Sequence, residues 1–73
     1  MSIRHSKKYK EIGIKVSKYR NQRGMTQEEL ANAVGVSYSY ITQIEAPNVV
    51  KKMSLEVLFD IAEVLCIDVK DLL

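Results

Sequence analysis

The sequence predicts an all-α domain of five helices with no strand. Three observations lead to this fold class. Apolar residues recur at helical spacing in several segments, Ser or Thr stands at the expected start of three of them, and Gly follows the expected end of two. The 73 residues, of which 47% are hydrophobic, suit one domain with a single modest core.

The first helix is expected over residues 9–23 and is followed by Gly24. Its inner face is expected to hold Ile12, Val16 and Tyr19. Gly13 lies inside this helix and weakens it by about 1 kcal/mol relative to Ala. Residues 1–8 are polar and basic, so they are assigned to an N-terminal arm, and residues 9–73 are assigned to the folded domain.

Two short helices are expected next, and each has its own start signal. Thr26 stands three residues before Glu29, the spacing of a capping box, and Ser37 is placed to cap the following helix. Gly35 lies between them, where a residue without Cβ can adopt positive φ. The inner positions are expected to be Leu30, Ala33, Val34, Ile41 and Ile44. Two helices joined by a short turn containing Gly form a helix-turn-helix.

A fourth helix is expected after Pro47, which ends the third helix, and Ser54 is its cap. Its inner stripe is expected to comprise Leu55, Leu58, Phe59, Ala62 and Leu65, widened by Ile61, Val64 and Cys66. A wide apolar arc indicates either deep burial or a surface for a partner. A last turn begins at Asp68, and Leu72 and Leu73 are expected to fold back on the core.

Charge is distributed unevenly along the chain. Residues 1–24 contain eight Lys or Arg and one Glu, a net +7, although the whole chain carries only +2. Such a basic end indicates either attraction to phosphate groups or an ordinary solvated surface.

Several classes of protein are not indicated. No apolar run approaches the ~20 residues that span a bilayer, no signal peptide is recognisable, and the single Cys excludes an internal disulfide, so a cytoplasmic location is expected. The chain has neither a nucleophile–base set nor a phosphate-binding Gly loop, and its one His has no partners for a metal site. Cys66 is expected to be an inert core thiol. We therefore expect no enzyme activity, cofactor or metal.

From Ile12 onward the chain resembles the Cro/CI-type (XRE-like) helix-turn-helix transcriptional regulators. The segments that carry this resemblance are YRNQRGMTQEELA (19–31), VGVS (34–37) and YITQIE (40–45). The resemblance implies a compact, five-helix, lambda-repressor-like domain that binds DNA.

The resemblance also implies roles for individual residues. Those facing base edges in the major groove would be Tyr38, Ser39 and Gln43, with Thr42 a weaker candidate. Those contacting phosphate would be Gln27, Ser37 and Tyr40, although Tyr40 suits packing equally well. Arg20 and Glu45 match a pair that forms a structural ion pair in relatives.

Two features depart from the family pattern. Relatives usually have a shorter, Gly-containing turn after the position of Glu45, so a phosphate contact made there would be missing or supplied by Asn48, Lys51 or Lys52. The third helix also contains no Arg or Lys, which favours sites containing A·T pairs and moderate affinity per subunit.

The sequence therefore predicts a sequence-specific, double-stranded DNA-binding regulator, acting as a repressor at an inverted-repeat operator. The expected partner besides DNA is a second copy bound through the C-terminal helices, with a monomer as the alternative. The N-terminal arm either frays or settles on the DNA. The alternative function is a protein-interaction module, such as an antitoxin or adapter of a toxin–antitoxin pair. Neither a membrane nor a small-molecule ligand is indicated.

Overall fold

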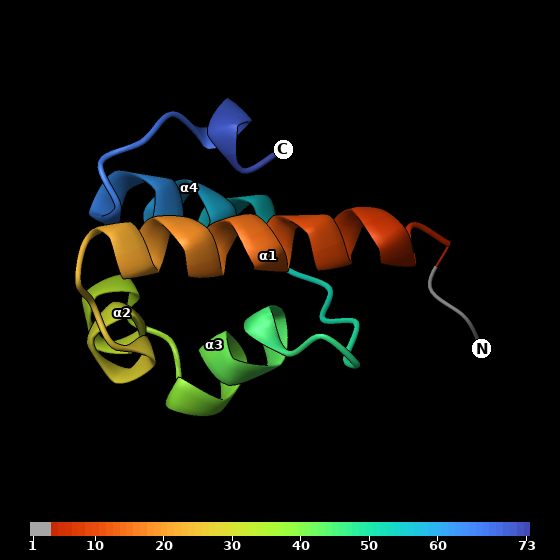
Figure 1. Ribbon diagram of the computed structural model, residues 1–73, viewed down its shortest axis with the longest axis horizontal. Helices are drawn as coiled ribbons and strands as arrows, with labels where there is room; N and C mark the ends of the chain where they lie inside the picture. Colours follow the sequence, from red (N-terminus) through yellow and green to blue (C-terminus); the bar gives the residue numbers. More distant parts are fainter. Residues whose placement is uncertain (1–3) are drawn as a thin grey trace.

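The computed structural model describes residues 4–73, which contain helices and loops only (Figure 1). The elements are α1 (Ser6–Gln22), α2 (Gln27–Val34), α3 (Tyr38–Glu45), α4 (Leu55–Val64) and the 3-10 turn η1 (Val69–Asp71). The all-α prediction is confirmed, but the expected fifth helix is only this short turn. Helix α4 lies alongside α1, and the α2–α3 pair packs against both (Figure 1).

Helix α1 begins at Ser6, earlier than the Tyr9 expected from the sequence, so the last residues of the predicted arm are helical. The stretch from Ser6 to Lys10 contains neither Gly nor Pro to stop the helix. Residues 1–3 of the predicted arm lie outside the described residues. At the other end, the Met25 N–H donates to the Arg20 carbonyl at 3.1 Å, and Gly24 adopts a φ of 66°.

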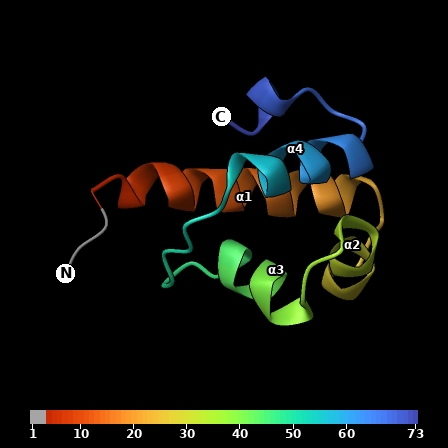
Figure 2. The same ribbon diagram turned by 180° about the vertical axis from the view of Figure 1, so that it is seen from behind.

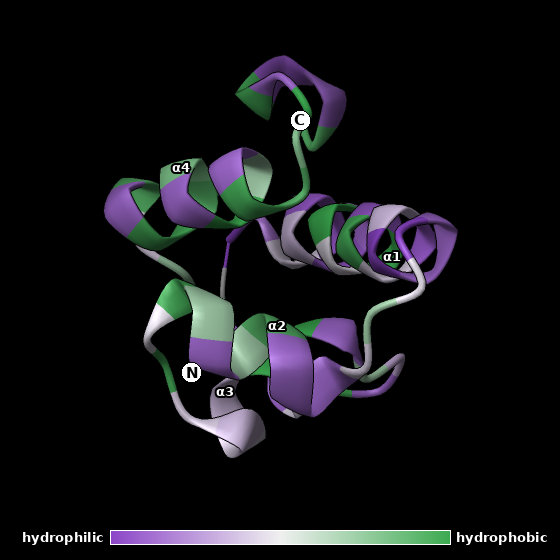
Figure 3. Ribbon diagram, turned by 90° about the vertical axis from the view of Figure 1, so that its left-hand side faces the viewer, coloured by the Kyte–Doolittle hydropathy of each residue, from purple (hydrophilic) through white to green (hydrophobic). Residues whose placement is uncertain are grey.

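The core lies where α1, α2, α3 and α4 converge. Its fully buried side chains are Val16, Leu30, Ile41, Ile61, Leu65 and Leu72. Figure 3 shows the apolar side of α4 turned toward α1 and α2. On α2 one predicted core position is wrong: Ala33 is exposed, and Ala31 is buried in its place. Helix α2 is only two turns long, and the side that includes Ala31 is the one in contact with the core.

Gly13 lies where α1 packs closely against the end of α3. A Cβ built on Gly13 would overlap the carbonyl oxygen of Ile44 and lie 3.1 Å from the Ile44 carbonyl carbon. The glycine that weakens α1 as an isolated helix therefore lets its backbone contact the end of α3 directly.

The C-terminal region differs from the prediction on its outer side. Leu55 and Phe59, expected on the inner stripe, are 65% and 50% exposed, and Leu73 is 65% exposed although Leu72 is buried. The apolar arc of α4 is wider than the surface that α1, α2 and η1 cover, so its edge stays uncovered. Leu55 and Phe59 are one helical turn apart and therefore adjoin on this edge.

Cys66 is not a core thiol, because the structure places it on the surface. It follows the end of α4 with a φ of 58°, while the Ile67 N–H donates to the Ala62 carbonyl at 3.0 Å. This is the left-handed position that ends many helices. The exposed thiol lies 3.9 Å from the carbonyl oxygen of Val64, the last residue of α4.

The loop from α3 to α4 runs past α1 (Figure 2). As predicted, α3 ends just before Pro47, with Ala46 in an extended conformation (φ −67°, ψ 129°) that suits a residue preceding proline. The loop returns the chain to Ser54, whose hydroxyl accepts from the Val57 N–H at 3.2 Å and starts α4.

Candidate nucleic-acid interface

Local capping determines where α2 begins and ends and where α3 begins. The Thr26 hydroxyl accepts from the Glu29 N–H at 3.0 Å, while the Thr26 N–H donates to the Glu29 carboxylate at 2.8 Å, which completes the predicted capping box. Gly35 ends α2 with a φ of 85°. The Ser37 hydroxyl then accepts from the Tyr40 N–H at 3.1 Å, so α3 begins where the sequence predicted. The helix-turn-helix is thus defined by short-range hydrogen bonds.

Helix α3 has one apolar face and one polar face. Ile41 and Ile44 are buried, whereas Tyr38 is 55% exposed. Ser39 and Gln43 are also exposed, and Thr42 is half-buried. The four residues expected to face base edges therefore share the open side of α3, with Thr42 nearest its edge.

Hydrogen bonds within α3 orient this polar face. The Gln43 amide nitrogen donates to the Ser39 hydroxyl at 3.3 Å, and the Thr42 hydroxyl donates to the Ser39 carbonyl at 2.9 Å. Ser39 and Gln43 are one turn apart, so they lie on the same face. The face offers neutral donors and acceptors, since the side chain of Glu45 is engaged elsewhere.

Arg20 and Glu45 form an ion pair that ties α1 to the last residue of α3. The Arg20 Nε and Nη2 donate to the two carboxylate oxygens of Glu45, each at 2.8 Å, and Nη1 donates to the Met25 carbonyl at 2.7 Å. The two side chains are only 11% and 5% exposed. The hydrogen bond from Glu45 raises the pKa of the Arg20 guanidinium above its already high range, and burial opposes this shift. Arg20 therefore stays charged, and its guanidinium holds α1 against the end of α3.

Gln27, the first residue of α2, is half-buried and contacts the same ion pair. Its amide nitrogen donates to the Glu45 Oε1 at 3.0 Å. This hydrogen bond joins residues 18 positions apart, and no pattern in the sequence indicates it. Gln27 also lines a shallow surface hollow together with Asn32 and Tyr38. Asn32 was not singled out from the sequence, although it lies on the same side of α2.

The loop after α3 places a positive charge beside the helix. The Lys51 ammonium lies 4.9 Å from the centroid of the Tyr40 ring, which is a cation–π geometry. Tyr40 is half-buried and packs against the core, so the packing role left open by the sequence is observed. Asn48 and Lys52 are exposed on the same loop. The longer loop thus brings a lysine next to α3.

No group of three or more His, Cys, Asp or Glu side chains that could hold a metal ion occurs among residues 4–73. In the same part of the chain, each helix is either too short or too polar to cross a membrane.

Comparisons with known proteins agree with this geometry. A family model described as helix-turn-helix matches residues 16–72. The chain is similar to the restriction-modification controller protein C.AhdI from Aeromonas hydrophila, with 26% identity and a TM-score of 0.81 over 89% of this chain and 96% of that one. It is also similar to SinR, a master regulator for biofilm formation solved in complex with DNA, with 34% identity and a TM-score of 0.77 over 84% of this chain and 95% of that one.

A third structure, the clp gene regulator ClgR from Corynebacterium glutamicum, has 29% identity and a TM-score of 0.82 over 89% of this chain and 67% of its own. No match was found among curated proteins. The family model covers the capped α2–α3 pair, the buried ion pair and α4. The chain therefore belongs to the XRE-type helix-turn-helix family of DNA-binding regulators.

Proposed function

We propose that this protein is a sequence-specific transcriptional regulator that represses by occupying double-stranded DNA, with α3 in the major groove. The observation that carries this proposal is the polar face of α3. Tyr38, Ser39 and Gln43 are exposed on this face, while the opposite face is buried and the two ends of the helix are fixed by a cap and an ion pair. Rigid placement of a recognition helix is what base reading requires. The similarity to SinR, which was solved with DNA, supports the same assignment.

Base reading is assigned to Tyr38, Ser39 and Gln43, with Thr42 secondary. An amide can pair bidentately with the N6 and N7 atoms of adenine, so Gln43 has the clearest specificity. The Tyr38 ring edge suits a thymine methyl group. Since α3 offers no Arg or Lys for guanine, the preferred sites contain A·T pairs.

Phosphate contact is assigned to residues at the start of α2, at the start of α3 and on the loop that follows α3. These are Gln27, Ser37, Tyr40, Asn48, Lys51 and Lys52. The Ser37 hydroxyl accepts a hydrogen bond from the backbone, so its own O–H can donate to a phosphate oxygen. Lys51 is held beside Tyr40 and Lys52 is exposed, so the long loop supplies the positive charge that α3 lacks.

Replacing Lys51 with Ala tests the phosphate assignment. The variant is expected to bind a mixed-sequence duplex more weakly, and the slope of log Kd against log salt concentration is expected to fall by about one. Lys70→Ala is the matched control, because Lys70 lies on η1, away from α3 (Figure 1). Fluorescence anisotropy over a salt series measures both slopes. Equal slopes for the two variants would remove Lys51 from the interface.

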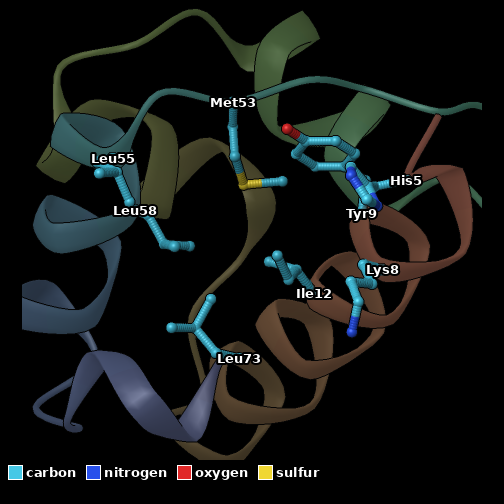
Figure 4. Close-up of a pocket in the computed structure, with 8 residues that line it drawn as sticks. All are labelled: His5, Lys8, Tyr9, Ile12, Met53, Leu55, Leu58 and Leu73. Atoms are coloured by element: carbon cyan, nitrogen blue, oxygen red, sulfur yellow. The ribbon is translucent and has the colours of Figure 1, made fainter. Parts of the chain in front are cut away.

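A homodimer is proposed through the C-terminal region. Leu55, Phe59 and Leu73 form an exposed apolar surface, and Leu55 and Leu73 also border an open hollow of about 360 Å³ beside α1 (Figure 4). Contiguous apolar surface of this kind marks interaction sites. Two-fold dimers place two recognition helices at half-sites about 34–36 Å apart, which compensates for the moderate affinity of one subunit.

Leu55→Glu is expected to abolish this association, because a charge would be buried in the apolar contact. Ile14→Glu is the control, since Ile14 is equally exposed but lies on α1 outside this surface. Sedimentation at micromolar concentration is expected to show a dimer for the unaltered chain and the control, and a monomer for Leu55→Glu. A species of 8.3 kDa alone for the unaltered chain would contradict the dimer.

A further inference from the structure

Glu45 has a second partner besides Arg20. The Gln27 amide nitrogen donates to Glu45 Oε1 at 3.0 Å, and the same oxygen accepts from Arg20 Nη2 at 2.8 Å. The Glu45 side chain is 5% exposed, so little water competes for these bonds. We propose that Glu45 is a positioning residue for DNA binding, which fixes the amide of Gln27 so that it presents one N–H to a phosphate. This inference rests on the proposed function.

The Glu45 carboxylate determines how the Gln27 side-chain amide is oriented. A carboxylate accepts hydrogen bonds and cannot donate, so the amide nitrogen must face Glu45 and the amide oxygen must face away. One of the two N–H groups is then used, and the other is left to donate outward. Gln27 also begins α2, where backbone N–H groups without helical partners favour an anion. The fixed side chain and the helix end therefore offer donors at the same place.

The charge of Glu45 would normally oppose this role, because a carboxylate repels phosphate. Arg20 compensates the negative charge of Glu45 by donating to both carboxylate oxygens, each at 2.8 Å. The bond from Arg20 to the Met25 carbonyl at 2.7 Å holds the guanidinium in place. The pair is neutral as a whole, so it anchors Gln27 without adding net negative charge to the interface.

An anchored side chain loses less rotamer freedom on binding than a free one. Gln27→Ala is therefore expected to weaken binding to a mixed-sequence duplex by about 5- to 10-fold at low salt. The same change should cost less than about twofold in a background without the anchor, because an unanchored Gln27 contributes little. That background is the double variant Arg20→Met/Glu45→Leu, in which apolar side chains replace both members of the ion pair.

The experiment compares the Gln27→Ala penalty in the two backgrounds, with Lys52→Ala as the control. Lys52 is exposed on the loop and is not among the hydrogen-bond partners of the pair, so its penalty should be the same in both. A smaller Gln27 penalty in the double variant supports positioning by Glu45. Equal Gln27 penalties overturn it while leaving the proposed function intact. Absence of DNA binding by the unaltered chain overturns the proposed function, and this inference with it.

A second measurement uses only the unaltered chain, so it does not depend on whether the double variant folds. NMR relaxation of the side-chain amides in the unaltered chain is expected to show Gln27 more ordered than the exposed Gln22 on α1. On adding the duplex, the Gln27 amide should shift and keep its order. Equal mobility of Gln27 and Gln22 in the free protein overturns the inference.

Discussion

Gly13→Ala is expected to lower the free energy of unfolding by about 3 kcal/mol. Helix propensity alone predicts the opposite sign, since Ala is favoured over Gly by about 1 kcal/mol inside a helix. The structure reverses this expectation, because the new Cβ would overlap the Ile44 carbonyl oxygen. That oxygen belongs to the backbone of α3 and cannot rotate away as a side chain could. The two helices would have to separate and loosen the core between them.

Gly24→Ala is the matched control for Gly13→Ala. Gly24 has a φ of 66° and no atom within 4 Å of a built Cβ, so the substitution introduces backbone strain without a clash. Its cost is expected to be about 1–2 kcal/mol. Urea unfolding followed by circular dichroism measures both values. A Gly13→Ala variant as stable as the unaltered protein would show that α1 and α3 are not in close backbone contact.

Arg20→Ala is expected to lower the free energy of unfolding by about 3–5 kcal/mol. The substitution leaves the Glu45 carboxylate, 5% exposed, with only the hydrogen bond from Gln27. An unpaired buried charge costs more than an exposed ion pair contributes, which explains the size of the effect. Arg20 also donates to the Met25 carbonyl, so the turn between α1 and α2 loses a contact as well.

The double variant Arg20→Met/Glu45→Leu is expected to be more stable than Arg20→Ala, because no buried charge is left without a partner. Thermal unfolding of both variants measures the difference.

The raised pKa of Arg20 means that the contribution of the ion pair to stability is fully present below the pKa of an unfolded Arg. This contribution is lost only as pH rises through the still higher pKa of the folded protein. The Arg20→Ala loss should therefore not shrink between about pH 6 and 9. An unchanged melting temperature for Arg20→Ala would contradict a scaffold role.

The helix-turn-helix could be predicted from sequence because its signals are short-range. Thr26 and Glu29 are three residues apart, and the Ser37 hydroxyl reaches only to the Tyr40 N–H, so the local sequence is sufficient to place both helix starts. Gly35 marks the turn for the same reason. The apolar face of α3, with Ile41 and Ile44, follows from helical spacing, and this also places the polar residues on the open side.

The errors arise where distant segments decide the outcome. Leu55 and Phe59 fit the helical stripe of α4, but whether they are covered depends on how far α1 and η1 extend over that helix. The effect of Gly13 on stability likewise depends on the carbonyl group of Ile44, 31 positions along the chain. The anchoring of Gln27 depends on Glu45, 18 positions away. Spacing within one helix carries no information about such contacts.

Whether α3 reads DNA sequence can be measured by selecting bound duplexes from a randomised pool. The unaltered chain is expected to enrich an inverted repeat containing A·T pairs. Gln43→Ala should still bind duplex DNA but lose preference at one position in each half-site, a discrimination of about 1–3 kcal/mol. Salt-sensitive binding without any enriched sequence would contradict the claim, because only phosphate attraction would remain.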